Sequence, residues 1–282
     1  PHDPFFAPRE FLDQYPDPPE LPPSYADDLA DKPRIYERLR NQAFGQLSPE
    51  EVREAIRHYW AYCSWMDSLF GRLVDALEAS GQAEDTSVLF CSDHGEYLGD
   101  HGIFCKGIAG FRQAYHVPAV VRWPGRLKHP GRSTDALASL ADWGPTFLEA
   151  AGRDVPDGLA GRSLLPFIEG DEPADWRKSM HTQCDGVELY YTQRAVWTKD
   201  WKFIFNGFDY DELYDLQNDP DEMLNRARDP RYGPVVRDLC RRHWRFAEAH
   251  DDGSKNAYYT VRLWPWGPID GLAPAPGADD AG

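Results

Sequence analysis

Apolar residues recur at helical spacing between residues 52 and 77. This stretch follows Ser48-Pro49-Glu50-Glu51, in which a serine can cap a helix, a proline suits the first turn and Glu51 completes a capping box. The pattern predicts one long amphipathic helix that runs to about Ala79 and ends near Gly81. Its apolar positions are Val52, Ile56, Tyr59, Trp60, Cys63, Met66, Leu69, Phe70, Leu73 and Leu77.

Two short apolar runs follow this helix, at residues 86–91 and 117–122. Both are rich in β-branched residues and read as buried strands, and residues 138–151 read as a further helix. Helices that alternate with buried strands are typical of an α/β fold with a parallel sheet. We therefore expect a mostly parallel sheet flanked by helices within residues 1–172, after an extended segment of about 33 residues.

The pattern changes after residue 172. Residues 194–198 and 201–206 predict two antiparallel strands joined by a tight turn, and residues 212–216 predict a third strand. Residues 234–250 have the apolar face of a helix. Residues 173–270 thus form a predicted smaller α+β subdomain, and the Pro/Ala/Gly-rich residues 271–282 form a predicted flexible tail.

Composition excludes several partners. The chain has 282 residues and a formal net charge of −17, which disfavours nucleic acid and anionic lipid because both bind through Lys and Arg. No apolar run is long enough to cross a bilayer. An odd number of cysteines, five, and the lack of an Asn-x-Ser/Thr site favour a reducing, cytoplasmic compartment. Because the chain opens at Pro1 without an initiator Met, we expect it to be part of a longer protein.

Candidate chemistry lies at Asp93-His94, directly after the first predicted strand. Ligands bind beyond the carboxyl ends of strands in α/β sheets, and a carboxylate with a neutral imidazole can hold a divalent cation. Gly95 eases the backbone turn that would let both side chains face one ion. A solvated turn with a hydrogen-bonded His94 is an equally open interpretation of these residues alone.

A Gly-rich loop follows and carries further candidates. Asp100-His101-Gly102 repeats the Asp-His-Gly triplet, and Lys106 is flanked by Gly107. A lysine beside a metal can hold an anionic ester oxygen, although most lysines lie on the surface. His116, before the second strand, fits a structural role at least as well.

These motifs resemble the sulfatase family of the alkaline-phosphatase-like superfamily, and the resemblance covers nearly the whole chain in order. It is carried by Pro1-His2-Asp3-Pro4-Phe5, Ser92-Asp93-His94-Gly95-Glu96, Leu98-Gly99-Asp100-His101-Gly102 with Lys106, Val117-Pro118, Trp123-Pro124-Gly125, Asp142-Trp143-Gly144-Pro145-Thr146, and Glu212-Leu213-Tyr214-Asp215-Leu216 with Asp219-Pro220-Asp221-Glu222. The resemblance implies an incomplete alkaline-phosphatase-like α/β fold.

The resemblance also implies roles for individual residues. Asp93 and His94 would ligate a divalent metal, calcium in most such sulfatases and manganese in some relatives. Lys106 would bind sulfate or phosphate oxygens, and His2 would contact the transferred group or the leaving oxygen. His101 would serve the loop structure or contact the substrate. Glu96 and Asp100 would orient the ligands.

The chain departs from the family pattern in what it lacks. Family members carry a Cys- or Ser-x-Pro-Ser-Arg nucleophile motif, oxidised to formylglycine, and an early Asp-Asp ligand pair. None of the five cysteines fits that motif, and Asp27-Asp28 reads as a solvated charge run. We therefore expect half an active site, inactive alone, that works on a small-molecule or sugar sulfate ester together with a missing N-terminal half.

Two alternatives stay open. One is a phosphonate or phosphate ester hydrolase of the same superfamily, and the other is a non-catalytic relic domain. Several aromatic residues beyond position 172 can wall a sugar pocket or pack in the core, and core packing is the favoured interpretation. These residues are Trp176, Tyr190, Tyr191, Trp197 and Trp201.

Overall fold

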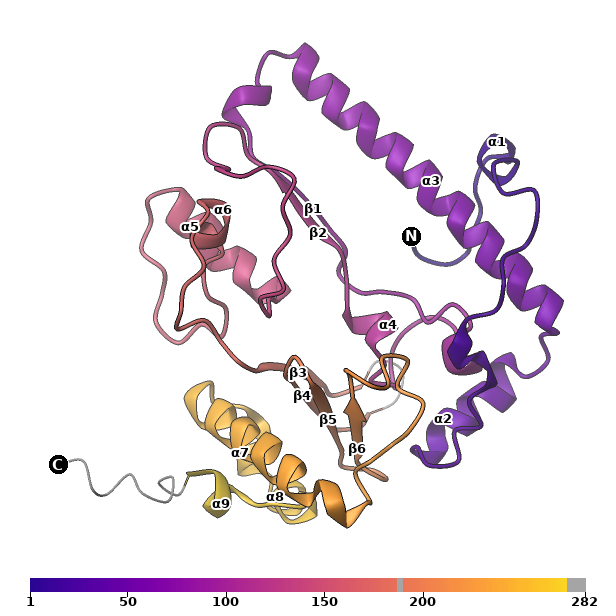
Figure 1. Ribbon diagram of the computed structural model, residues 1–282, viewed down its shortest axis with the longest axis vertical. Helices are drawn as coiled ribbons and strands as arrows, with labels where there is room; N and C mark the ends of the chain where they lie inside the picture. The colour runs from indigo at the N-terminus through magenta and orange to yellow at the C-terminus, as the bar shows by residue number, and fades with distance from the viewer. Residues whose placement is uncertain (187–189, 273–282) are drawn as a thin grey trace. The chain divides into compact units, whose positions relative to one another are not determined.

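The structure is a computed structural model that describes residues 1–186 and 190–272. From residue 273 onward the predicted tail lies outside the described residues. The chain divides into two compact units (Figure 1). The first comprises residues 1–30 and 34–130, and the second comprises residues 31–33 and 131–282. The sequence predicts a domain boundary at residue 172. This boundary stays a prediction, because a division into compact units does not test where a domain that folds on its own would begin.

The first unit is built around one long helix. The helices and strands of this unit are α1 (Arg9–Leu12), η1 (Pro23–Ala26), α2 (Arg34–Leu39), η2 (Arg40–Phe44), α3 (Pro49–Ala79), η3 (Ala83–Asp85), β1 (Val88–Cys91), η4 (Asp100–Gly102), α4 (Arg112–Tyr115) and β2 (Ala119–Arg122). Helices α1 and η1 interrupt the segment that the sequence predicts to be extended throughout.

Helix α3 begins and ends where the sequence predicts. The Ser48 hydroxyl accepts the Glu51 N–H at 3.2 Å, and the Glu51 carboxylate accepts the Ser48 N–H at 2.8 Å, so the predicted capping box is confirmed. Such caps stabilise a helix by about 1 kcal/mol. Of the predicted apolar face, only Val52 and Ile56 are fully buried, and Leu73 is 69% exposed.

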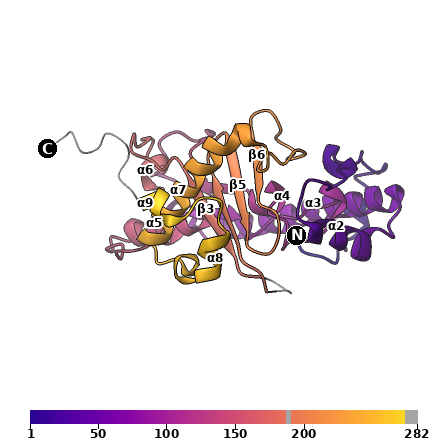
Figure 2. The same ribbon diagram turned by 90° about the horizontal axis from the view of Figure 1, so that it is seen from below.

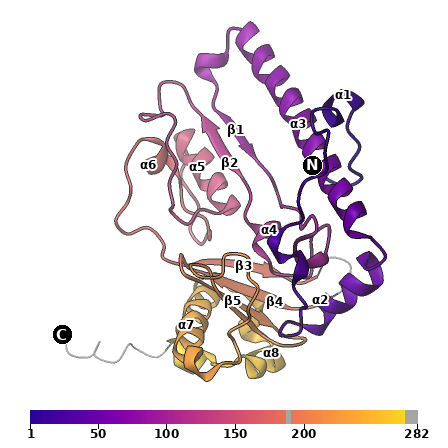
Figure 3. The ribbon, with the colours of Figure 1, turned by 45° about the vertical axis from the view of Figure 1, so that its right-hand side comes forward.

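Strands β1 and β2 form a two-stranded sheet that lies beside α3 (Figure 3), where Phe70 packs edge-on against Phe90 at 5.1 Å between ring centroids. The two strands are antiparallel, with Val88 opposite Arg122 and Cys91 opposite Ala119. The parallel pairing predicted for these strands is wrong. Two parallel strands need a connection that carries the chain back to the end of the sheet at which the first strand began. Residues 92–118 instead connect the end of β1 to the adjacent start of β2, so β2 runs in the opposite direction.

The strands are also less buried than predicted. Phe90 is 40% exposed and its cross-strand partner Val120 is 62% exposed. An apolar run predicts a buried strand only if other parts of the fold cover both faces of the sheet.

The second unit contains a four-stranded antiparallel sheet in the order β3-β4-β5-β6. The helices and strands of this unit are η5 (Leu140–Asp142), α5 (Trp143–Ala150), α6 (Leu165–Ile168), β3 (Met180–Cys184), β4 (Gln193–Trp197), β5 (Trp201–Asn206), β6 (Glu212–Asp215), η6 (Pro230–Tyr232), α7 (Gly233–Ala249), η7 (Gly253–Asn256), α8 (Tyr258–Leu263) and α9 (Pro268–Leu272). The predicted hairpin, third strand and C-terminal helix are confirmed as β4–β5, β6 and α7. Strand β3 was not predicted, and the helix predicted over 138–151 is a 3₁₀ turn followed by α5.

Helix α7 and α8 lie on one face of this sheet (Figures 2 and 3). Its core joins strand residues such as Phe203 and Phe205 to helix residues such as Leu239 and Trp244, and Trp264 stacks on Phe205 at 4.2 Å. Large aromatic side chains contribute most of the buried apolar area here. Within residues 1–186 and 190–272, no helix combines the length and apolar composition that a membrane span requires.

Candidate active site

Asp93 and His94 lie in the loop that follows β1, as predicted. The Gly95 N–H donates to the Ala114 carbonyl at 2.9 Å and so pins this loop to α4. A Cβ atom at Gly95 would lie 1.8 Å from the Gln113 carbonyl oxygen, so any larger residue would push the loop away from α4. The glycine therefore fixes where the two candidate ligands stand.

His94 is oriented by backbone hydrogen bonds. Its Nδ1 lies 2.8 Å from the Gly95 carbonyl oxygen, and because a carbonyl only accepts, Nδ1 carries the proton. In the neutral form of the ring Nε2 carries the lone pair, and this atom lies 3.9 Å from Asp93 Oδ2. Asp93 accepts the His94 N–H at 3.0 Å, a bond that lowers the pKa of its carboxyl. Asp93 Oδ2 and His94 Nε2, two atoms that can coordinate a cation, therefore lie close together, and the Asp93 side chain is 88% exposed.

His2 and Lys106 lie at the same place, although 104 positions separate them in the sequence. The Lys106 ammonium donates to His2 Nε2, while His2 Nδ1 lies 2.9 Å from the Asp3 carbonyl oxygen. The His2 and His94 rings are 5.8 Å apart, edge to face. The structure therefore brings together four of the five candidate site residues. His2 and Lys106 can contact an anionic group, and Asp93 and His94 can bind a cation.

The loop that carries Lys106 is held by Glu96. The Glu96 carboxylate accepts the Leu98 N–H at 3.2 Å and the Cys105 N–H, and Cys105 has a φ of 66° in the left-handed region. A non-glycine residue adopts that backbone only at an energetic cost, so the carboxylate helps to keep the turn before Lys106 in place. Burial raises the pKa of Glu96. Glu96 thus contacts the loop backbone and supports Lys106 through it.

His101, the fifth candidate, is buried. Its Nδ1 lies 2.7 Å from Asp27 Oδ2, its N–H donates to the Ser24 hydroxyl at 3.2 Å, and its ring stacks on Phe111 at 3.6 Å. Its Nε2 is buried and has no hydrogen-bond partner in the part of the chain that the structure describes. Of the two roles left open by the sequence, loop structure fits this geometry, since a substrate cannot reach a fully covered ring.

The interpretation of Asp27-Asp28 as a solvated charge run is wrong for Asp27. Asp27 is 5% exposed and bonded to His101, whereas Asp28 is exposed. No local pattern indicates this contact, because the two partners lie 74 positions apart. The pair fastens the η1 segment to the loop that ends at Lys106.

Tyr59 and Cys63 of α3, both predicted as apolar helix positions, lie close to each other, and Tyr59 also lies close to Glu96. Burial raises the pKa of Tyr59 to about 12, with further contributions from Cys63 and Glu96, and burial also raises the pKa of the Cys63 thiol. A thiol in this state is a weak nucleophile. All five cysteines are free, and neither Cys63 nor the buried Cys240 has the lowered pKa of a reactive cysteine.

The donor set fits part of a metal site. Asp93 offers a carboxylate oxygen and His94 offers Nε2, both of which suit a divalent cation. No group of three or more His, Cys, Asp or Glu side chains able to hold a metal occurs within residues 1–186 and 190–272. A complete coordination shell therefore needs ligands beyond this pair.

The chain matches two family profiles that together span most of its length. Residues 1–153 match the profile described as Sulfatase, and residues 99–249 match the profile described as N-sulphoglucosamine sulphohydrolase, C-terminal. Each covers more than half of the chain. The match includes every candidate site residue.

Individual proteins agree with this result. The choline-sulfatase of Rhizobium meliloti is 32% identical over 86% of this chain and 49% of its own length. The N-acetylglucosamine-6-O-sulfatase of Bacteroides thetaiotaomicron is 33% identical over 75% of this chain and 39% of its own length. The solved phosphonate monoester hydrolase of Agrobacterium radiobacter superposes with a TM-score of 0.80 and 27% identity, over 89% of this chain and 55% of that one.

Fold and sequence thus define an α/β chain of the alkaline-phosphatase-like class, which confirms that part of the predicted fold class but not the mostly parallel sheet. The chain belongs to the sulfatase family. It spans about half the length of the curated relatives that it matches.

Proposed function

We propose that this chain supplies part of the active site of a metal-dependent sulfatase that hydrolyses sulfate monoesters. The observation that carries the proposal is the convergence of His2, Asp93, His94 and Lys106 at one place. Two of these side chains can hold a cation, and the other two can contact an anionic ester. That pairing of opposite chemistries is what hydrolysis of a sulfate ester requires.

Asp93 and His94 would hold the metal, through a carboxylate oxygen and through Nε2. When bound, a divalent cation, calcium or manganese, supplies positive charge that polarises the ester's non-bridging oxygens. The Gly95 carbonyl fixes the His94 tautomer and leaves Nε2 free to coordinate. In that role His94 is no general base, because its lone pair is taken.

Lys106 and His2 would act on the ester itself. The Lys106 ammonium binds a sulfate oxygen and offsets the negative charge that develops there. His2 lies within contact of Lys106 and would contact the transferred group or the leaving oxygen. The Asp3 carbonyl, 2.9 Å from His2 Nδ1, holds the ring so that Nε2 faces Lys106.

The nucleophile would come from outside these 282 residues. The chain contains no Cys- or Ser-x-Pro-Ser-Arg motif that could give rise to formylglycine. The thiol of Cys63, which lies in the same unit as the site, has a raised pKa and does not replace that nucleophile. We therefore propose that an N-terminal half of the same protein completes the site, and that this chain alone has no turnover.

The substrate class we propose is a small-molecule or sugar sulfate ester. Choline-sulfatase and N-acetylglucosamine-6-O-sulfatase, each more than 30% identical, support both possibilities. The net charge of −17 opposes a nucleic-acid substrate. The resemblance to phosphonate monoester hydrolase supports a second candidate, hydrolysis of phosphonate or phosphate esters. A non-catalytic relic is the third possibility.

Steady-state turnover of phenyl sulfate and of the phosphonate monoester phenyl methylphosphonate by the complete protein separates these functions, because each releases phenol when its ester bond is hydrolysed. A sulfatase should favour phenyl sulfate in kcat/KM. A preference of tenfold or more for the phosphonate, equal to about 1.4 kcal/mol in the barrier, would overturn the sulfatase assignment. Turnover of neither ester by a complete protein that carries the nucleophile motif would support a relic.

A further inference from the structure

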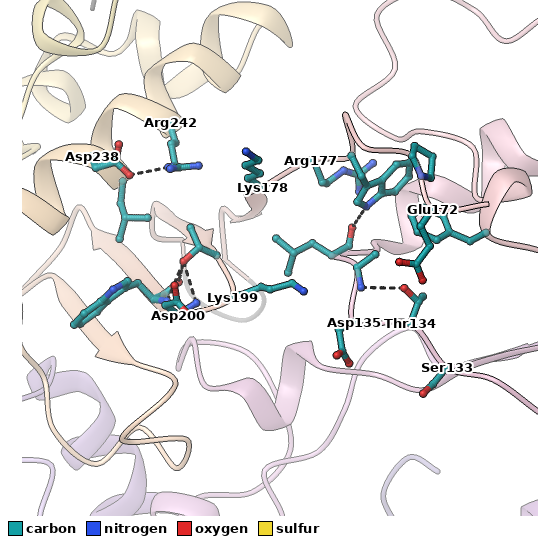
Figure 4. Close-up of a pocket in the computed structure, with 18 of the residues that line it drawn as sticks. Ser133, Thr134, Asp135, Glu172, Arg177, Lys178, Lys199, Asp200, Asp238 and Arg242 are labelled. Carbon is teal, nitrogen blue, oxygen red and sulfur yellow. Dashed lines mark hydrogen bonds and ion pairs between the residues drawn. The ribbon is translucent and has the colours of Figure 1, made fainter. Parts of the chain in front are cut away.

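Charged side chains are arranged differently in the two units. The second unit has a cavity of about 720 Å³ (Figure 4), and its lining includes none of the candidate active-site residues. There Arg242 donates to Asp238 at 2.8 Å, so these two charges offset each other locally. In the first unit the Asp3 carboxylate instead lies against a candidate site residue, His2.

Two oxygen atoms of Asp3 contact one nitrogen of the His2 ring. The carboxylate Oδ1 lies 3.0 Å from His2 Nδ1, and the Asp3 carbonyl oxygen lies 2.9 Å from the same nitrogen. Because an ionised carboxylate and a carbonyl only accept, the single proton of the neutral ring sits on Nδ1 and is shared between them. The opposite nitrogen, Nε2, is the one that Lys106 contacts. Asp3 thus holds one edge of the ring and directs the other edge to Lys106.

Asp3 is itself held in place by packing of a neighbouring residue. The Phe5 ring packs edge-on against Tyr59 of α3 at 5.1 Å between ring centroids. Phe5 also packs against the core cluster that includes Val52 and Ile56. This apolar contact fixes the segment more firmly than the exposed ion pair can, since exposed ion pairs contribute little to stability. The carboxylate is therefore not needed to anchor the segment and is available to orient the ring.

The position of Asp3 is electrostatically unfavourable for an anionic substrate. Burial raises the pKa of Glu96, and the nearby negative charge of Asp3 adds to that rise. A carboxylate beside a lysine that binds an ester anion repels that anion at short range. The Asp3 side chain is 49% exposed and does not fill the core. Its contact with His2 offsets the electrostatic cost, because the ring would otherwise be free to rotate.

We propose that the Asp3 carboxylate is a positioning residue for ester hydrolysis. By accepting the Nδ1–H of His2 it holds the ring with Nε2 towards Lys106 and the ester. Asp3 itself contacts neither the ester nor the metal. The inference rests on the function proposed above, which gives His2 its contact with the transferred group or the leaving oxygen. It adds to that function a residue that acts only through His2.

Nitrogen NMR of the His2 ring tests the contact whatever reaction the protein catalyses. Ring nitrogens are labelled with ¹⁵N in the complete protein, and His2 is assigned from its absence in His2→Ala. At about pH 8.5, two units above the ordinary histidine pKa, the spectrum reports which nitrogen carries the proton of the neutral ring. We expect the Nδ1–H form in the unmodified protein and in Asp3→Asn, whose amide oxygen also accepts, and a mixture of both forms in Asp3→Ala. An unchanged tautomer in Asp3→Ala would overturn the proposal.

A double-mutant cycle tests whether Asp3 acts through His2. The quantity measured is kcat/KM for whichever ester the complete protein hydrolyses, phenyl sulfate or phenyl methylphosphonate. Asp3→Ala should lower it roughly tenfold, the low end for losing a group that orients a functional histidine, because the pair is half exposed. In a His2→Ala background the same change should have no further effect, and Asp3→Asn should keep most of the activity. Equal losses in both backgrounds would mean that Asp3 acts independently of His2, which would overturn the proposal.

Asp13→Ala is the matched control. Asp13 is an exposed carboxylate of the same unit that pairs with Arg9 at 2.7 Å, so the change removes a comparable ion pair without a candidate site residue. It should leave the His2 tautomer and kcat/KM unchanged. A loss in Asp3→Ala that Asp13→Ala matches, or no loss at all, would also contradict the inference. A complete protein that hydrolyses neither ester contradicts the proposed function instead, and the His2 tautomer in Asp3→Ala still decides whether Asp3 orients the ring.

Discussion

His94 Nε2 lies 3.9 Å from Asp93 Oδ2, while Nδ1 of the same ring donates a hydrogen bond to the Gly95 carbonyl at 2.8 Å. The backbone therefore decides which nitrogen is available, and that nitrogen stands next to a carboxylate. A metal ion that binds both atoms would draw them to a shared centre. Adjacent residues achieve this only in a non-regular loop, which the close approach of Gly95 to α4 enforces here.

This relationship predicts the effect of His94→Ala on metal content. In the complete protein, the variant should lose most of its bound divalent metal and its esterase activity together, because one of the two donors from this chain is gone. Metal stoichiometry by plasma mass spectrometry, measured beside activity, checks this. His129→Ala, which removes an exposed histidine, is the control. Activity lost with unchanged metal content would show that His94 is not a ligand.

Lys106→Ala should behave differently from His94→Ala. The metal should stay bound, since Lys106 is not a donor to a cation, while kcat/KM for a sulfate ester falls by roughly 10²-fold, the typical effect of removing one charge-stabilising donor. Inhibition by inorganic sulfate should weaken in parallel. Lys128→Ala should change neither quantity. A Lys106→Ala protein with normal sulfate inhibition would contradict the proposed anion contact.

The contact between His101 and Asp27 predicts a stability effect without a direct role in chemistry. His101→Ala removes a buried hydrogen bond to the Asp27 carboxylate and the stack on Phe111, and should lower the free energy of unfolding by about 3 kcal/mol. Urea denaturation measures this, and His129→Ala should change the value by less than about 0.5 kcal/mol. Equal effects of the two substitutions would mean that the pair contributes nothing.

Local patterns predicted the elements that depend on local interactions. Helix α3 follows from its capping box and apolar repeat, and the β4–β5 hairpin follows from two apolar runs around a short turn. Strand β3, with the sequence Met-His-Thr-Gln-Cys, has no such pattern. It is a strand because β4 provides its hydrogen-bond partners, and that pairing is a tertiary property.

In the candidate site, too, local patterns predicted some features, whereas others depend on contacts between distant residues. The position of Asp93-His94 after a strand could be predicted from sequence, because strand ends deliver ligands in α/β folds. The contact between Lys106 and His2 across 104 positions could not, and only the family resemblance implied it. The burial of Asp27 was missed because a pair of acidic residues in a Pro-rich segment looks solvated until its distant partner, His101, is known.

Two buried histidines of the second unit predict that the chain loses stability in mild acid. Burial lowers the pKa of His181 to about 3, with help from His243, and lowers that of His243 to about 4. In the unfolded chain both would titrate near 6.5. Between pH 6.5 and pH 4 the unfolded chain therefore binds two more protons at these histidines, so stability falls as the pH falls.

Asp211 acts in the opposite direction. Burial raises the pKa of its carboxyl from 3.8 to about 7, so in the same range the folded chain holds one extra proton there. The net difference for the three groups is one proton, which corresponds to a loss of about 1.4 kcal/mol of unfolding free energy per pH unit below 6.5. Urea denaturation at several pH values between 4.5 and 6.5 measures this slope.

Two substitutions separate the opposing contributions. His243→Gln keeps a partner for Ser254 and removes one titrating group, so the slope should approach zero. Asp211→Asn keeps an oxygen that can accept the Asn206 N–H, and by removing the opposing group it should steepen the slope to about 2.7 kcal/mol per pH unit. A slope that is the same in all three proteins would show that these groups do not control the acid response. A slope that steepens with His243→Gln would reverse the sign assigned to the buried histidine.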